Sequence, residues 1–328
     1  MSDALLALLA PGHVRSGEAL AASLGLTRAA VWKQIGALRK LGVEIEAVPG
    51  QGYRLVRPIE LLDAHAIESN LSDRARALLA SLEVLRSVDS TNARLLAATP
   101  PPAGRAAVCI AEYQTAGRGR RGRTWVAPLG AGLCMSVAWC FATPPPQLGA
   151  LGLAIGIGAA NALHSYGYGQ VQLKWPNDLV ARDAKLGGIL TELHGEMDGP
   201  AHVVVGMGVN YDLPAAARAV VAAEGNPKVT DLRELSDGAV PGRNELVAAL
   251  VSALIETLAR FELTGFASFR SAWSALDVLA GEDVVVRSGE RTQSGRACGV
   301  DQDGALVLES DDGIVQRVVA GEASLRRA

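Results

Sequence analysis

Residues 117–123 read Gly-Arg-Gly-Arg-Arg-Gly-Arg, the stretch of the chain with the strongest chemical character. Arginine offers a planar, permanently charged group that matches carboxylates and phosphates, and glycine lets the backbone pass close to a ligand. The pattern therefore predicts a loop that binds an anion. A solvated basic loop, or one that contacts nucleic acid, is the alternative that this stretch alone leaves open.

Two further motifs combine charged and amide groups with predicted strand ends. Lys174-Trp175-Pro176-Asn177-Asp178 follows an apolar run, so that proline ends a predicted strand and a cation, an amide and a carboxylate collect at its terminus. Lys185 opens Lys-Leu-Gly-Gly-Ile-Leu, where another strand is predicted to begin. Polar groups at strand ends are common in binding sites. A plain turn at Asn177-Asp178 and a surface position for Lys185 are the alternatives.

In this order and spacing, the three motifs resemble those of the biotin protein ligases. The segment over 16–55 resembles the DNA-binding domain of the bifunctional members, which also repress biotin synthesis. The resemblance implies an ATP-dependent, AMP-forming biotin–[biotin carboxyl-carrier protein] ligase. Such an enzyme uses ATP and Mg²⁺ to form biotinyl-5'-AMP and transfers biotin to a lysine of a carrier protein. A lipoate or octanoyl carrier-protein ligase, and a DNA-binding repressor with vestigial ligase activity, are the alternatives.

The resemblance also implies which residues bind the two substrates. Both reactants of the first step are anions, so fixed positive charge is needed at the forming bond. The neutral ureido ring of biotin needs hydroxyl and amide partners instead. The expected biotin contacts are Ser90, Thr91, Asn92, Gln114, Arg118, Gly119, Arg120 and Lys185, and the expected nucleotide contacts are Arg121, Arg123, Trp125 and Asn177.

Four of the charged residues are expected to be catalytic: Arg118, Arg120, Lys185 and Asp178. Asp178 is assigned to the transfer step, where a carboxylate can orient the attacking lysine and take its proton. Binding of Mg²⁺ is the competing role for Asp178. Ser90 precedes a predicted helix, so capping of that helix competes with its role in binding biotin.

The N-terminal residues predict a winged helix-turn-helix domain. Ser16 and Thr27 are suited to cap successive helices, and Gly25 to end the first. In such a domain the second helix enters the major groove of DNA, and a module that only dimerises or regulates is the alternative. The predicted helices cover 17–24 and 28–40, the hairpin strands cover 44–48 and 53–56, and the expected contacts to operator DNA are Arg28, Trp32 and Lys33.

The rest of the chain completes an α+β protein with four predicted parts. The central part is predicted to have a mixed, largely antiparallel sheet with helices, because short turns join successive strands. The C-terminal strands predict a small β-barrel, which is SH3-like in the family. The parts are a winged helix-turn-helix over 1–60, a linker helix within 61–80, a catalytic domain over 81–276 and the SH3-like domain over 277–328. Predicted strands cover 83–88, 106–112, 132–140, 171–175, 186–193, 202–209, 284–287, 295–300, 305–309 and 314–319, and predicted helices cover 59–70, 91–98, 147–165 and 245–263.

Composition favours a cytoplasmic protein with no membrane span. The 328 residues are 49% hydrophobic, and the net charge of −3 argues against bulk binding of polyanions, so that DNA must meet a local basic surface. No secretory signal is evident at the N-terminus. The apolar segment 148–163 is shorter than the roughly 20 residues of a spanning helix and is predicted to pack on a sheet. The family resemblance implies a homodimer.

Overall fold

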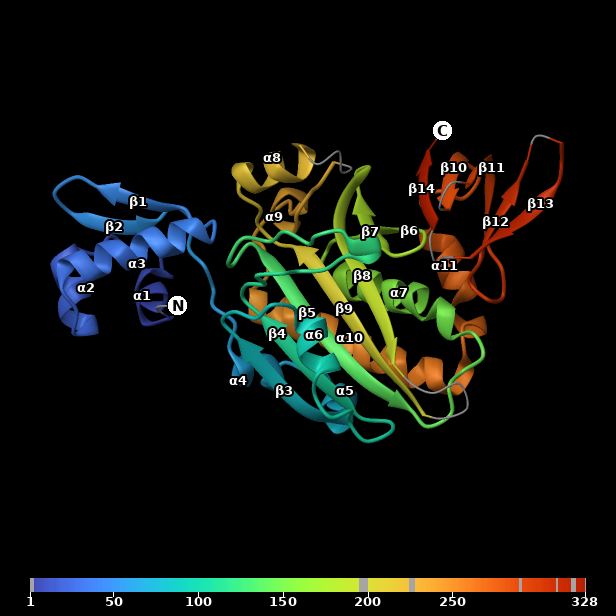
Figure 1. Cartoon of the computed structure of the whole chain (residues 1–328), viewed down its shortest axis with the longest axis horizontal. Coiled ribbons are helices and arrows are strands. Elements are labelled where there is room, and N and C mark those ends of the chain that lie inside the picture. Colours follow the sequence, from blue (N-terminus) through green and yellow to red (C-terminus); the bar gives the residue numbers. More distant parts are fainter. Residues whose placement is uncertain are drawn as a thin grey trace.

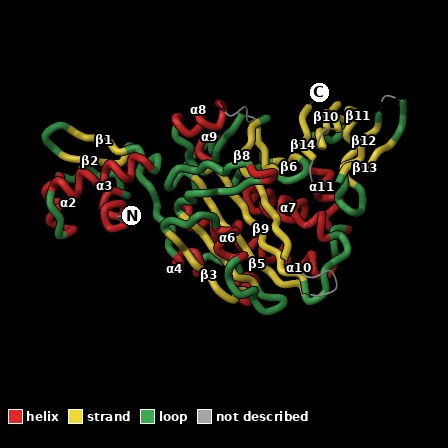
Figure 2. The backbone as a smooth tube through the Cα atoms, viewed as in Figure 1, coloured by secondary structure: helices red, strands yellow, loops and turns green. Residues whose placement is uncertain are grey.

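The computed structural model of the chain describes residues 3–194, 200–223, 228–288, 291–310, 312–319 and 323–327. Three parts lie in a row along the longest axis of the molecule (Figure 1). A small N-terminal domain is followed by a large central sheet with helices and by a β-rich C-terminal part (Figure 2). The predicted α+β architecture is confirmed.

The N-terminal domain is a helical unit with a two-stranded wing. The Oγ atom of Ser16 accepts a hydrogen bond from Ala19 N at 3.0 Å, and Thr27 caps the next helix in the same way. Gly25 ends the first of these helices with a φ of 63°, a left-handed conformation that suits glycine. An additional helix, which the sequence analysis missed, precedes them. The elements are α1 (Asp3–Leu9), α2 (Gly17–Leu24), α3 (Arg28–Lys40), β1 (Ile45–Val48) and β2 (Gly52–Leu55).

The central sheet has seven strands in the order β3-β4-β5-β9-β8-β7-β6. Only the β3–β4 pair is parallel, so the expected largely antiparallel sheet is confirmed. The strand predicted over 83–88 begins and ends earlier, and the strand β7 was missed. The bounds are β3 (Leu79–Leu85), β4 (Ala106–Ala111), β5 (Gly132–Phe141), β6 (Gln172–Lys174), β7 (Asp178–Ala181), β8 (Ala184–His194) and β9 (Ala201–Asn210).

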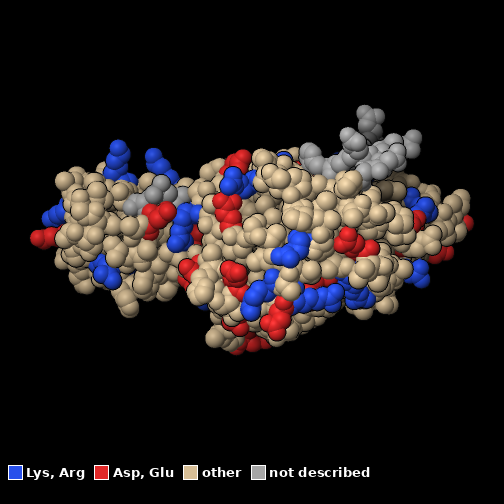
Figure 3. Space-filling model, turned by 90° about the horizontal axis from the view of Figure 1, so that it is seen from below, with Lys and Arg blue, Asp and Glu red and all other residues tan. Residues whose placement is uncertain are grey.

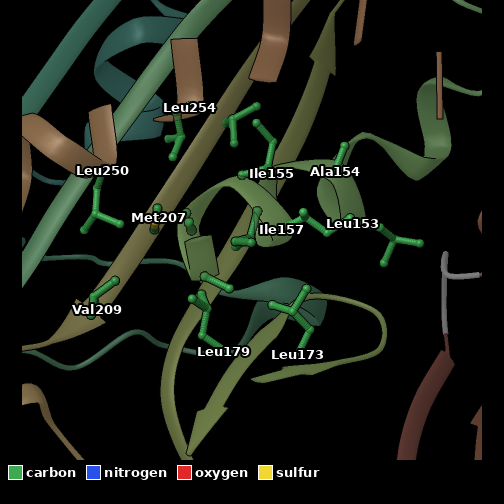
Figure 4. Close-up of a cluster of buried hydrophobic side chains, with 14 of the residues drawn as sticks. Leu153, Ala154, Ile155, Ile157, Leu173, Leu179, Met207, Val209, Leu250 and Leu254 are labelled. Atoms are coloured by element: carbon green, nitrogen blue, oxygen red, sulfur yellow. The ribbon is translucent and has the colours of Figure 1, made fainter. Parts of the chain in front are cut away.

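Side-chain alternation gives this sheet two different faces. One face packs on the long helices α7 (Leu151–Ser165) and α10 (Arg243–Thr264), whose apolar side chains meet Met207 and Val209 of β9 (Figure 4). The other face carries the short helix α6 (Thr91–Leu96). Glycines and small polar residues on that second face leave room for a binding site.

The helix α7 contains the apolar segment that invited a membrane interpretation. A window over Leu148–Ser165 is long and apolar enough to span a membrane, but 56% of it is buried inside the protein. The 3-10 turn η2 (Leu148–Ala150) leads into the helix. The segment therefore serves as a core helix beneath the sheet, as predicted.

The linker differs from the single helix predicted over 59–70. Two short helices, α4 (Ala64–Ser69) and α5 (Asp73–Leu78), occupy the region, and Asp63 caps the first one. The prediction began too early because residues 59–62 form no helix, and Glu60 and Leu62 are bonded to the catalytic part instead. Ile67 and Leu71 are buried in the main core, so the linker packs as part of the central domain.

A buried ion pair fastens the linker to the central domain. Arg243, at the start of α10, lies 2.7 Å from the Oε2 atom of Glu112, and the two side chains are 1% and 0% exposed. Arg243 also donates to the Glu60 carbonyl at 2.6 Å, and Asn244 donates to the Glu60 side chain at 2.7 Å. Removing either partner would leave the other side chain buried without an opposite charge beside it.

The C-terminal part is a five-stranded antiparallel sheet in the order β13-β12-β11-β10-β14. The sequence analysis predicted four of these strands and missed the last one. The Trp175 indole donates to the Gly304 carbonyl at 3.2 Å, which joins this sheet to the central domain. The bounds are β10 (Asp283–Ser288), β11 (Arg291–Val300), β12 (Leu306–Glu309), β13 (Val315–Val318) and β14 (Ala323–Arg327). Three further helices that were not predicted are α8 (Ala215–Ala223), α9 (Leu232–Leu235) and α11 (Arg270–Leu276), and a 3-10 turn, η3 (Ala267–Phe269), precedes the last.

Candidate functional site

A cavity of about 400 Å³ opens on the second face of the central sheet. Its walls come from segments far apart in the chain, namely the start of α6, the arginine loop over 117–123, β7, β8 and β9. The structure brings every one of the predicted substrate-binding and catalytic residues to this cavity. They are Ser90, Thr91, Asn92, Gln114, Arg118, Gly119, Arg120, Arg121, Arg123, Trp125, Asn177, Asp178 and Lys185.

One end of the cavity is built from uncharged polar side chains. Thr91 is 3% exposed, and its backbone N–H donates to the Oε1 atom of Gln114 at 2.8 Å. This bond leaves the amide NH₂ of Gln114 to face another partner. Ser90 caps α6, since its Oγ atom accepts from Ala93 N at 3.4 Å while the residue also lines the cavity. The capping role is therefore observed alongside the position expected for a ligand contact.

Two residues that the sequence analysis missed support this neutral end without lining the cavity. The Ser136 hydroxyl on β5 lies 2.7 Å from the Thr91 hydroxyl and 2.6 Å from the Asn92 Oδ1 atom. The Asn92 NH₂ group donates to Glu192 of β8 at 2.7 Å. Glu192 also accepts from Arg118 at 3.2 Å. No sequence motif marks Ser136 or Glu192, although strand alternation places both on the face of the sheet that bears the cavity.

Two glycines of β9 give the larger side chains room to lie on the sheet. A Cβ atom at Gly206 would lie 2.1 Å from the Asn92 Oδ1 atom, and one at Gly208 would lie 2.4 Å from the Trp125 ring. Real side chains do not approach so closely. The cavity floor therefore depends on both glycines, which the sequence analysis did not assign to the site.

The other end of the cavity is charged. The Lys185 Nζ atom lies 2.6 Å from the Asp178 Oδ1 atom, and each side chain is 24% exposed. Arg120 donates to the Asn177 Oδ1 atom at 3.1 Å, while Asn177 donates to the Ile189 carbonyl at 2.9 Å. Asp178 begins β7 rather than following the end of a strand, because a short hairpin joins β6 to β7. That hairpin brings the amide and carboxylate to face Lys185.

The arginine loop places several positive charges at this charged end. Gly119 N donates to the Arg123 carbonyl at 2.7 Å, and Trp125 N donates to the Gly117 carbonyl at 2.9 Å, so the loop is closed at its base. Arg121 has a φ of 60°, an uncommon conformation for a residue other than glycine. Burial lowers the pKa of Arg120, an effect opposed by the charge of Asp178. Crowded cations of this kind favour an anionic ligand.

Magnesium has no dedicated cage of protein ligands in the described part of the chain. No group of three or more His, Cys, Asp or Glu side chains gathers there. Mg²⁺ often binds through one or two carboxylates and the phosphates of a nucleotide. Asp178 supplies a carboxylate at the cavity, and the site therefore fits an ion that enters together with ATP.

The second candidate site is the outer face of α3. Trp32 is 67% exposed, and Arg28 and Lys33 are also exposed. The opposite face, with Val31 and Ile35, is fully buried in the N-terminal core. On the face of the protein shown in Figure 3, acidic and basic side chains are interspersed over the central part. The exposed Arg28, Trp32 and Lys33 make α3 the candidate surface for DNA.

Family models match three successive segments of the chain. The Biotin/lipoate A/B protein ligase family matches residues 84–210, an HTH domain matches residues 2–54, and the Biotin protein ligase C terminal domain matches residues 280–326. Fold and site thus define a ligase of the biotin and lipoate class that carries a helix-turn-helix domain.

Individual relatives narrow this class. The chain is 42% identical over 324 residues to the Bifunctional ligase/repressor BirA of Escherichia coli (strain K12), covering 99% of this chain and 97% of that protein. It is 31% identical over 306 residues to the protein of the same name from Bacillus subtilis (strain 168), covering 91% and 90%. A solved structure of the biotin protein ligase from Aquifex aeolicus in complex with biotin and ATP has a TM-score of 0.62 and 27% identity, covering 76% of this chain and 100% of that chain.

The chain belongs to the bifunctional ligase/repressor BirA family. It is a biotin protein ligase with a helix-turn-helix repressor domain, and biotin and ATP with Mg²⁺ are its substrates and cofactor. The comparisons therefore favour biotin over the lipoate alternative that the sequence motifs left open.

Proposed function

We propose that the two ends of the cavity divide the work of binding biotin and ATP. The observation that supports this division is the sorting of the side chains, with hydroxyls and amides at one end and Arg120, Lys185 and Asp178 at the other. A ureido ring is neutral and needs directional hydrogen bonds, whereas a carboxylate and a triphosphate need positive charge. The neutral end then binds the ureido ring, and the charged end binds the reacting groups.

In the first step the biotin carboxylate attacks the α-phosphate of ATP and releases pyrophosphate. Lys185 and Arg120 would contact the carboxylate and phosphate oxygens and reduce the repulsion between the two anions. Arg118 and Gly119 contact biotin from the loop. Arg121 and Arg123, exposed at the mouth, hold nucleotide phosphates, and Asn177 fixes the nucleotide in place.

For Trp125, which the sequence analysis expected to contact the nucleotide, we propose a place beside the biotin portion instead. Its ring lies on Gly208, and the Cβ position of Gly117 lies 3.3 Å from the Gln114 Nε2 atom and 3.4 Å from the Trp125 Cβ atom. Trp125 is thus a neighbour of the neutral end. We assign it to covering the biotin portion of the intermediate, where an indole ring excludes water from the acyl-phosphate.

In the second step a carrier-protein lysine attacks the acyl carbon of biotinyl-5'-AMP, and AMP leaves. The attacking amine must lose a proton, and the Asp178 carboxylate is placed to accept it. The Lys185 Nζ atom lies 2.6 Å from the Asp178 Oδ1 atom and would orient the carboxylate in the cavity. Coordination of Mg²⁺ in the first step is compatible with the same position.

The test of this assignment measures the mass of a biotin carboxyl carrier domain after incubation with the protein, Mg²⁺, ATP and either biotin or lipoate. We expect one biotin adduct on one lysine and none from lipoate. An Asp178→Asn variant should lose more of the transfer rate than of the adenylation rate in single-turnover assays. Equal loss in both steps would contradict the role given to Asp178.

We further propose that α3 binds operator DNA as part of a cytoplasmic homodimer. Arg28 and Lys33 would contact phosphates and base edges, with Trp32 between them. An Arg28→Ala/Lys33→Ala variant should bind biotin-operon promoter DNA with about a hundredfold lower affinity in a gel-retardation assay, while its ligation rate stays normal. Unchanged retardation would contradict the assignment. Point substitutions are preferred to deletion of residues 1–60, because Glu60 is bonded to Arg243 and Asn244.

A further inference from the structure

We infer that Glu192 is a positioning residue that orients the neutral end of the cavity for biotin. The inference rests on the proposed assignment of this end to biotin. Glu192 is not among the residues lining the cavity, yet it accepts hydrogen bonds from two that do, Arg118 at 3.2 Å and Asn92 at 2.7 Å. It therefore acts on the ligand through its neighbours.

The charge of Glu192 fixes the direction of the hydrogen bonds across the cavity floor. An ionised carboxylate only accepts, so Asn92 must turn its NH₂ group toward Glu192 and the Leu190 carbonyl, which is 3.3 Å away. The Asn92 oxygen then faces Ser136, whose hydroxyl proton must be donated to it. The same Ser136 hydroxyl lies 2.7 Å from the Thr91 hydroxyl, and the Thr91 hydroxyl donates to the Gln114 Oε1 atom at 3.1 Å.

The consequence for the ligand lies at the end of this chain of bonds. Because the Thr91 hydroxyl donates to Gln114 and accepts from Ser136, it has one lone pair left to offer to the cavity. A ureido ring carries two N–H donors, which need such an acceptor. A neutral amide in place of Glu192 can either donate or accept, so the direction of the bonds would no longer be fixed.

The same carboxylate also anchors the first arginine of the loop. Arg118 is 44% exposed and lies on a loop, whereas Glu192 is 25% exposed and lies on β8, where it pairs with Val204 of β9. An exposed ion pair alone contributes little, but this one shares its carboxylate with the buried Asn92. Glu192 therefore fixes Arg118 against a rigid strand, and Arg118 reaches the ligand from a defined position.

The test compares Glu192→Gln with Glu83→Gln in the full-length protein. Glu83 is the matched control, because it also bonds an arginine, Arg94, at 3.0 Å and 3.1 Å, but lies outside the cavity. We expect E192Q to raise the KM for biotin about tenfold, since it loses charge-assisted hydrogen bonds, while the KM for ATP and the melting temperature stay near those of the wild type. E83Q should leave both KM values unchanged.

A double-substitution cycle separates positioning from a merely structural role. In an Arg118→Ala background, E192Q should raise the KM for biotin by a smaller factor than in the wild type, because one of its two partners is gone. A biotin KM within twofold of the wild type in E192Q would overturn the inference. A rise in the KM for ATP alone would instead overturn the assignment of this end to biotin, as would an unchanged biotin KM in Gln114→Ala.

Discussion

The two ends of the cavity are built in opposite ways. The neutral end is buried, and its side chains bond one another across a helix and two strands, as in the contacts of Ser136 with Thr91 and Asn92. The charged end is more exposed, and most of its cations lie on a loop whose backbone hydrogen bonds close it at its base. The ureido ring keeps its shape during the reaction and can be recognised by fixed hydrogen-bond partners. The reacting carboxylate and phosphate, in contrast, change charge and geometry. Under the proposed assignment, recognition and chemistry therefore take place at separate ends of the cavity.

The largest expected effect comes from removing the cation at the reacting bond. Lys185→Ala should slow formation of biotinyl-5'-AMP by roughly a hundredfold to a thousandfold, the usual cost of losing one preorganised charge. The variant also leaves Asp178 without its lysine partner at 2.6 Å. Single-turnover release of pyrophosphate measures the rate. A Lys185→Ala/Asp178→Asn variant serves as the control. If its adenylation rate recovered, the defect of Lys185→Ala would come from the unpaired Asp178 carboxylate and not from the lost cation.

The next effect comes from filling the floor of the neutral end. In Gly206→Ala the new Cβ atom would clash with the Asn92 Oδ1 atom, and overpacking of this kind costs about 1–3 kcal/mol. We expect the KM for biotin to rise more than tenfold with little change in the KM for ATP. Gly169→Ala is the control, since no atom lies within 4 Å of its Cβ position. An equal rise in the KM for biotin and the KM for ATP would mean that the two ends of the cavity do not bind the two substrates separately.

The loop is tested by shortening one of its arginines. Arg120→Gly should release biotinyl-5'-AMP into solution about tenfold faster, because the contact with Asn177 that closes the loop over the cavity is lost. Labelling of bystander proteins, read by mass spectrometry, measures the release. Labelling confined to the carrier lysine at the wild-type rate would argue against a retaining loop.

The smallest expected effect is the loss of one hydroxyl from the neutral end. Ser136→Ala removes the link between Thr91 and Asn92 and should raise the KM for biotin about fivefold, equivalent to roughly 1 kcal/mol. Titration calorimetry with biotin alone can detect this change. An unaltered affinity would show that Thr91 and Asn92 hold their places without the shared hydroxyl.

Sequence patterns located the site but not all of its supports. Caps such as Ser16 and Thr27 are local signals, and the motifs that line the cavity carry recognisable charges. The sequence analysis missed Glu192 and Ser136 because they contact Asn92 from positions 100 and 44 residues away, respectively. They lie on strands whose pairing no local sequence pattern reveals. The helix α8 escaped for another reason, since its alanine- and valine-rich sequence has no marked start or end. Long-range pairing, rather than local preference, decides such contacts.

A single leucine has a consequence for protein engineering. Leu129 follows the cavity residues Trp125 and Val126 by a few positions, yet its side chain is 2% exposed and belongs to the hydrophobic core of the N-terminal domain, where its N–H bonds the Leu41 carbonyl at 3.1 Å. A shortened enzyme without the N-terminal domain would leave this leucine in water, a few residues from the cavity residues Trp125 and Val126. Designers of compact labelling enzymes from this chain should therefore replace Leu129 with a polar residue at the same time as they shorten it.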